Sequence, residues 1–238
     1  LAFKLAHEGK DLDDKTVERH AAMKSIMGWV RLHPYNIAQK VQIVVEHHRQ
    51  YVGPLLQGKA KSMVVVASRV EAVRWQLAME KYIKEHGYKL RTLVAFSGEV
   101  SDEASGPDDF TENSVSLNPT LKGREISEAF KTDEFQILLV ANKFQTGFDQ
   151  KLLCGMYVDK RLAGIQAVQT LSRLNRAYPG KDTTYVVDFV NEAEDILEAF
   201  KMYHTTAELQ STTDPNLVFD LRAKLDAAGH YDDFLDRP

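Results

Sequence analysis

The chain has 238 residues, of which 44% are hydrophobic, and a formal net charge of −4. This size and composition suit a globular protein with its own core, and the negative total argues against a wholly basic nucleic-acid binder. No apolar run reaches the roughly 18 residues of a membrane helix, and no secretory signal opens the chain. We therefore expect a cytoplasmic protein with no membrane partner. Its single cysteine, Cys154, cannot form an intrachain disulfide and is predicted to be a small core residue.

The charge is unevenly distributed along the chain. Residues 98–118 contain six acidic side chains and no lysine or arginine, and residues 201–238 are also net negative. The rest of the chain is therefore net positive and can bind a phosphate backbone locally. Ordinary solvated surface charge explains the same distribution equally well.

The chain is predicted to begin with helices. Apolar residues recur at helical spacing within residues 12–32 and 36–56, and Pro34 precedes the second of these segments. The adjacent His47 and His48 are interpreted as part of a helix surface. A metal site is not expected here, because no third ligand follows at a convincing spacing.

Residues 53–60 imitate a phosphate-binding loop, since they fit the pattern G-x-x-x-x-G-K. Two features argue against that function. Ala60 stands where a serine or threonine would coordinate Mg²⁺, and the segment follows a helix and precedes a strand, the reverse of the required order. We interpret it as a loop with a basic patch formed by Lys59 and Lys61.

Five short apolar runs, each bounded by polar or turn residues, are predicted to be strands buried on both faces of a parallel sheet. They are Met63–Ala67, Leu90–Phe96, Ile137–Val140, Met156–Val158 and Tyr185–Val187. Helices are expected at residues 70–86, 119–131, 191–203 and 215–229, with Trp75 in the core. The fold class is therefore α/β.

Residues 98–118 are predicted to form a long acidic loop. Within it, Asp102-Glu103-Ala104-Ser105 imitates the acidic box of ATPases. A functional acidic box follows an apolar strand, which places its carboxylates to hold Mg²⁺. No such strand precedes Asp102, so we expect a loop without that function.

Two segments contain candidate binding residues. In AVQTLSRLNR, taken as a helix, Gln169, Arg173 and Arg176 fall on one face, where the guanidinium groups could bind a phosphate. A solvated helix face is the alternative. In Thr146-Gly147-Phe148-Asp149, which follows the third predicted strand, the glycine allows close backbone approach and the aspartate could accept a ribose hydroxyl.

These segments resemble a known family. The run NKFQTGFD resembles motif V of superfamily 2 helicases and translocases, QTLSRLNR resembles their motif VI, and the strand ending at Ser68-Arg69 resembles motif IV. More narrowly, the text from LLVANKFQTGFD to SRLNR resembles the R subunit of type I restriction-modification enzymes. The resemblance extends over most of the chain from about His33 onward.

The resemblance implies the second RecA-like (helicase C-terminal) motor domain of that subunit, a parallel sheet flanked by helices with added N- and C-terminal helices. We expect a helical lead-in at residues 1–54, the motor domain at 55–190 and a helical extension at 191–238. The implied function is ATP-dependent translocation of double-stranded DNA before endonucleolytic cleavage, which is the work of a hydrolase.

The resemblance also assigns roles to individual residues. Arg173 and Arg176 would reach the γ-phosphate of ATP, and Gln169 would orient an arginine or the attacking water. Gly147 and Asp149 would contact the nucleotide. The face that tracks duplex DNA would be lined by Ser68, Arg69, Ser97, Gly98 and Thr146.

The implied cofactors are ATP and Mg²⁺ in the full subunit, with none bound to this fragment. The implied partners are double-stranded DNA, the first RecA-like domain, and the methyltransferase and specificity subunits. No phosphate loop, acidic box or nuclease motif is recognisable, so the fragment alone is expected to be inactive. The alternative is a DNA-binding or subunit-docking module without a direct role in ATP hydrolysis; a free-standing nucleotide-binding enzyme is less favoured.

Overall fold

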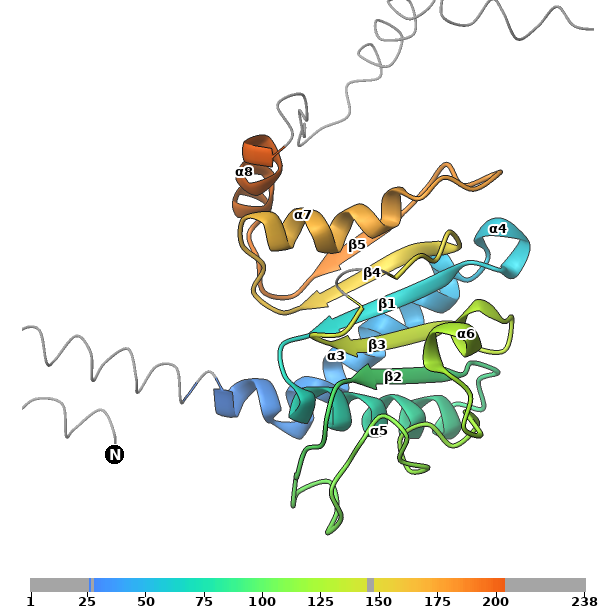
Figure 1. Ribbon diagram of the computed structural model, residues 1–238, viewed down its shortest axis with the longest axis vertical. Helices are drawn as coiled ribbons and strands as arrows, with labels where there is room; N and C mark the ends of the chain where they lie inside the picture. The colour runs from blue at the N-terminus through green and yellow to red at the C-terminus, as the bar shows by residue number, and fades with distance from the viewer. Residues whose placement is uncertain (1–25, 27, 145–147, 204–238) are drawn as a thin grey trace, which may run out of the picture.

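A five-stranded parallel sheet lies at the centre of the molecule, with the strand order β2-β3-β1-β4-β5 (Figure 1). The computed structural model describes residues 26, 28–144 and 148–203. The strands are β1 (Lys61–Val66), β2 (Thr92–Phe96), β3 (Ile137–Ala141), β4 (Leu153–Asp159) and β5 (Tyr185–Asp188).

The burial of the strands explains their sequences. Every residue of β1, β2, β3 and β4 is buried, which is why these strands are nearly continuous apolar runs. The edge strand β5 is only partly buried. All five predicted strands, and their parallel arrangement, are confirmed. Cys154 and Trp75 are both fully buried, as predicted.

Helices cover both faces of the sheet (Figure 1). On one face, α3 (Pro34–His47) and α5 (Arg69–Glu85) pack against alternate side chains of the strands. On the other lie α6 (Ile126–Lys131), α7 (Ile165–Leu171) and α8 (Ala193–Tyr203). Short elements complete the fold: a π-helix at His48–Val52, α4 at Leu55–Gly58 and a 3₁₀-helix at Ser172–Asn175. No helix of the described residues could cross a membrane.

Three helix predictions need correction in extent. The helix expected at 119–131 begins only at Ile126, because Lys122 and Gly123 adopt left-handed backbone conformations that a helix cannot contain. The helix expected at 36–56 changes to a π-helix at His48. The helix expected to include Arg176 ends at Leu171 and continues only as a 3₁₀ turn. The helix expected at 215–229 lies outside the described residues.

The prediction that His47 and His48 form a helix surface is wrong. His48 is 1% exposed, and its Nδ1 lies 2.7 Å from the Ser62 hydroxyl. The ring of His47 is half-buried, with Nδ1 2.9 Å from the Tyr157 hydroxyl. The end of α3 lies on β1 and β4, so both rings meet hydroxyls of those strands. No group of three metal-ligating side chains occurs among the described residues.

The prediction of a basic patch that includes Lys61 is also wrong. Lys61 begins the central strand and is 2% exposed. Its ammonium donates hydrogen bonds to the carbonyls of Thr132, at 2.7 Å, and Phe135, at 2.5 Å, and lies 4.9 Å from the centroid of the Phe130 ring. The lysine therefore satisfies the carbonyls between α6 and β3, while Lys59 remains exposed.

Replacing Lys61 should change how stability depends on pH. Burial lowers the pKa of Lys61 to about 8, although attraction by Asp133 opposes this shift. Between about pH 8 and the unfolded pKa near 10.4, the unfolded chain binds a proton that the folded chain lacks, so stability rises with pH. The free energy of unfolding of the native chain, relative to Lys61→Met, should increase across this window by at most about 1.4 kcal/mol per pH unit. Urea denaturation of both proteins at several pH values measures this difference in the free energy of unfolding. A difference that does not change with pH would contradict the prediction.

Candidate functional site

The first group of predicted site residues lies at the carboxyl ends of β1 and β2. Ser68 caps α5: its hydroxyl accepts a hydrogen bond from the Glu71 backbone N–H at 3.2 Å, and the Glu71 carboxylate accepts one from the Ser68 N–H at 3.3 Å. This reciprocal capping box satisfies donors at the start of the helix. The Ser68 hydroxyl is thus used by the fold, while the next residue, Arg69, is exposed.

Arg69 connects the ends of the two strands. Its Nη1 donates a hydrogen bond to the carbonyl of Ser97 at 3.3 Å. Gly98 follows with a φ of +78°, and a Cβ there would lie 3.0 Å from Arg69 Nη1. A glycine is therefore needed both for the turn and for the approach of the guanidinium. The structure brings together Ser68, Arg69, Ser97 and Gly98, four of the residues predicted to line the DNA-contacting face.

The acidic loop beside this group is fixed by arginine and lysine partners. Asp102 accepts two hydrogen bonds from Arg74, at 2.6 and 2.7 Å, and these bonds hold the pKa of its carboxyl below the usual range. Glu112 pairs with Lys143. Asp102 lies in a turn rather than after a strand, so the interpretation of residues 102–105 as a loop is confirmed. Sequence reasoning missed the Arg74–Asp102 pair, because nothing local connects residues 28 positions apart.

The second group of predicted site residues, after β3, does not lie at the carboxyl ends of the strands as expected. Asp149 was predicted to lie at the carboxyl end of a strand, but the chain after β3 returns toward the amino ends of the strands. The Gln150 side chain donates to the carbonyl of Phe130 at 3.2 Å, and the Leu152 carbonyl accepts from the N–H of Lys61, the first residue of β1. Asp149 therefore lies near the amino end of the sheet. Thr146 and Gly147 lie outside the described residues.

Arg173 is turned into the protein. It is 9% exposed, and its Nη1 donates a hydrogen bond to the carbonyl of Phe148 at 2.7 Å. Burial lowers the pKa of its guanidinium, and the nearby positive charge of Arg176 lowers it further. Its Nε is buried with no hydrogen-bond partner among the described residues. Sequence reasoning found the residue but not its contact with a backbone carbonyl.

Arg176, in contrast, is exposed. It follows the 3₁₀-helix in extended conformation, and its Nε lies 3.4 Å from the Asp149 carboxylate, with both side chains more than half exposed. Gln169 is exposed on α7. The prediction that Gln169, Arg173 and Arg176 share one helical face is wrong, because the helix ends at Leu171 and the following 3₁₀ turn directs the two arginines differently.

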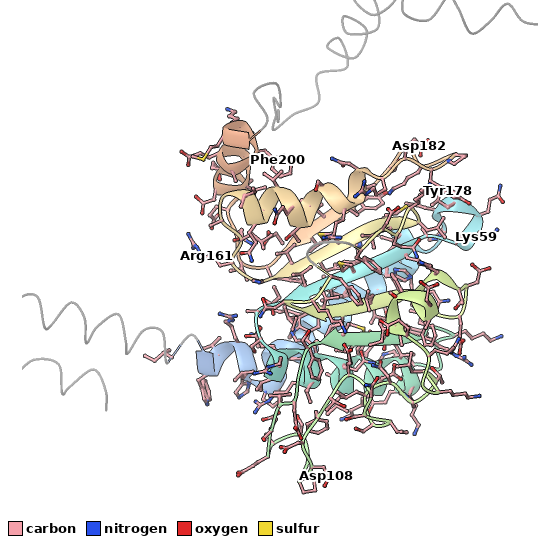
Figure 2. The ribbon with its side chains drawn as sticks, viewed as in Figure 1. Lys59, Asp108, Arg161, Tyr178, Asp182 and Phe200 are labelled. Atoms are coloured by element: carbon pink, nitrogen blue, oxygen red, sulfur yellow. The ribbon has the colours of Figure 1, made fainter. Side chains whose placement is uncertain are left out.

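The two groups therefore occupy opposite ends of the sheet. Arg69 and its neighbours follow the last residues of β1 and β2, whereas Arg176 and Asp149 lie toward the amino ends. The loop that follows Arg176, with Tyr178 and Asp182, lies at the same end as Lys59 (Figure 2). A strand as long as β1, at about 3.3 Å per residue, separates the two ends by roughly 20 Å.

Comparison with known proteins supports the resemblance. Residues 108–191 match the family described as type I restriction enzyme subunit R domain 3. The MjaVIIP type I restriction enzyme endonuclease subunit of Methanocaldococcus jannaschii is 29% identical over 167 residues, which are 63% of this chain. The chain is thus similar to segments of type I restriction enzyme endonuclease subunits.

Other similar proteins are also endonuclease subunits of type I restriction enzymes. The MjaIXP endonuclease subunit of the same organism is 26% identical over 74% of the chain, and the SauCOLORF180P endonuclease subunit of Staphylococcus aureus (strain COL) is 35% identical over 35% of it. The matched segments cover only 15%, 16% and 9% of these three relatives, so this chain corresponds to a small part of each.

Two solved structures share a distant likeness with the chain. One is the C-terminal domain of a Dbp5 variant from S. cerevisiae bound to a Gle1 variant and IP6, with a TM-score of 0.41 and 15% identity, covering 79% of this chain and 92% of that one. The other is domain 2 of the DEAD-box helicase Mss116p bound to an RNA duplex, with a TM-score of 0.42 and 14% identity, covering 82% and 72%. At these TM-scores and identities, the two structures carry no argument about the function of this chain.

Replacing the two arginines should affect stability very differently. Arg173→Ala removes a buried, charged donor and leaves the Phe148 carbonyl unpaired, so unfolding should become easier by about 2–3 kcal/mol. Arg176→Ala removes an exposed ion pair and should change the free energy of unfolding by less than about 1 kcal/mol. Urea denaturation of the two variants measures the difference. Equal losses would show that Arg173 does not hold the segment at Phe148.

Proposed function

We propose that this chain is the second motor domain of a type I restriction R subunit, which takes part in ATP-dependent translocation along double-stranded DNA before cleavage. The observation that carries the proposal is the convergence of the two motif segments. Arg173 binds the carbonyl of Phe148, and Arg176 faces Asp149. The relatives' identity as endonuclease subunits of type I restriction enzymes supports it.

The two arginines have different functions in this proposal. Arg176 is exposed and can reach the γ-phosphate of ATP bound against the first motor domain, where an arginine contributes about 10³–10⁵ in rate in GTPases. Asp149 holds it while no nucleotide is present. Arg173 is buried and keeps the Phe148–Asp149 segment in place, so it is a positioning residue. The proposed substrate is ATP with Mg²⁺, whose γ-phosphoryl group would be transferred to water as the β–γ phosphoanhydride bond breaks.

The DNA-contacting role falls to the opposite end of the sheet. Arg69 is an exposed cation there, and the N-terminus of α5 adds partial positive charge next to it. Ser97 and Gly98 present backbone to the same surface, together with Arg69. Motion of this domain relative to the first, driven by hydrolysis at the Arg176 end, would then move the DNA contact. The methyltransferase and specificity subunits are the proposed further partners.

The domain limits are part of the proposal. We assign the motor domain to residues 55–190, with 1–54 leading into it and 191–238 extending it. The flanking elements are not detached, because α3 packs in the same core as α5, and Ala199 of α8 packs against the sheet face that bears α7. We place further functions of the subunit outside this segment.

In the whole R subunit, Arg176→Ala should reduce ATP turnover by at least about 10³-fold, because the γ-phosphate loses its cation. Arg91→Ala is the matched control, since Arg91, just before β2, is an exposed arginine that pairs with Glu134 rather than with a residue of the motif segments. A DNA-stimulated ATPase assay measures both variants. Retained turnover in Arg176→Ala would refute the catalytic role and favour the alternative, a DNA-binding or docking module.

DNA affinity separates the two functions further. The association constant K of the 238-residue chain for a DNA duplex is expected to fall as the salt concentration rises. In Arg69→Ala, the slope of log K against the logarithm of the salt concentration should be shallower by about 0.9, because one phosphate contact is lost. Arg176→Ala should leave the slope unchanged. Fluorescence anisotropy over a salt series measures it. If substitution of Arg173 and Arg176 makes the slope shallower instead, these arginines bind DNA phosphates. That result would favour the alternative, a DNA-binding or docking module.

A further inference from the structure

A pocket of about 500 Å³ lies at the amino ends of the central strands. Three turns form its walls: the end of the π-helix with His48 and Gly53, the turn before β1 with Gly58, and the turn after α5 with Gly87–Lys89. None of its lining residues belongs to either of the two groups described above. Its size suits a ligand as large as a mononucleotide.

Glycines leave much of the wall as bare backbone. Gly58 and Gly87 have φ values of +83° and +65°, and a Cβ on either would meet no other atom within 4 Å. Both are therefore needed for the backbone conformation of their turns rather than for close packing. Gly53 acts differently: a Cβ there would lie 3.2 Å from the carbonyl of His48 and 3.6 Å from its Nε2, so the glycine lets the turn pack closely on that residue.

His48 has an unused hydrogen-bonding atom at this wall. Its Nδ1 is bonded to Ser62, but its Nε2 is buried and has no partner among the described residues. Burial lowers the pKa of the ring to about 4, so the ring is neutral at physiological pH. A buried polar atom without a partner is uncommon and calls for an explanation, and π-helical turns such as the one that begins here occur often at functional sites.

The side chains at the mouth of the pocket are cationic. The guanidinium of Arg49 lies 3.5 Å from the centroid of the Tyr88 ring and shares its charge with Glu46, at 2.8 Å. Lys89 is exposed and has no ion pair within the described part of the chain. No aspartate or glutamate is among the lining residues. The lining thus combines an aromatic ring, two cations and a neutral imidazole.

We propose that this pocket binds a phosphate-bearing ligand. Lys89 and Arg49 would bind phosphate oxygens, as cations in phosphate sites do, and the ring of Tyr88 positions the guanidinium of Arg49 for this by lying against it. The buried ring of His48 forms part of the pocket wall and would report binding through its NMR signals. This site is separate from the proposed ATP and DNA contacts, so it does not depend on the proposed function.

The test is NMR titration of the isotope-labelled 238-residue chain with inorganic pyrophosphate, ATP and a DNA duplex. The amide signals of Gly58 and Gly87 and the ring signals of His48 should shift together. Lys89→Ala should weaken the affinity that these signals report by about tenfold, the loss of one charge-assisted hydrogen bond. The control Lys201→Ala, an exposed lysine on α8, should leave it unchanged.

The three ligands distinguish the sources of the phosphate. Shifts with pyrophosphate or ATP indicate a small-molecule ligand, and shifts with the duplex alone indicate a nucleic-acid backbone. ATP bound at Arg176 would shift signals of Asp149 and Arg176 instead, and Arg176→Ala would abolish only those. The proposal is overturned if no ligand shifts the pocket signals at millimolar concentration, or if Lys89→Ala leaves their affinity unchanged.

Discussion

The hydrogen bond from Arg173 to the carbonyl of Phe148 is the contact on which the candidate nucleotide site depends. A buried guanidinium is stable only where its donors find acceptors, and here the acceptor is the backbone of a segment 25 residues earlier in the chain. The bond therefore holds the segment after β3 against the end of α7. With Arg173 used in this way, Arg176 is left exposed beside Asp149.

The rigid sheet separates two surfaces with different chemistry. At the carboxyl end, the capping box of α5 and the approach of Arg69 to Ser97 form a surface of backbone groups beside an exposed guanidinium. At the amino end, the exposed guanidinium of Arg176 lies beside the Asp149 carboxylate. β1 is hydrogen-bonded to β3 on one side and to β4 on the other, so it connects the two ends through the middle of the sheet.

The acidic loop illustrates how charge that looks functional in a sequence can be structural. Asp102 is fixed by Arg74 from α5, and Glu112 binds both Lys143 and the backbone N–H of Phe96 at the end of β2. These carboxylates attach the loop to the domain and neutralise two nearby cations.

The sequence alone determined the five buried strands and the two motif segments, because continuous apolar runs leave few alternatives to a covered parallel sheet and because the arginine and Phe-Asp runs are distinctive. It also excluded the phosphate-loop and acidic-box imitations. Only the tertiary structure decided which atoms meet. Lys61 can be buried because the carbonyls of Thr132 and Phe135 accept hydrogen bonds from its ammonium. Arg173 and Arg176 point in different directions because helix α7 ends at Leu171. Such contacts depend on the path of distant segments, which local spacing does not specify.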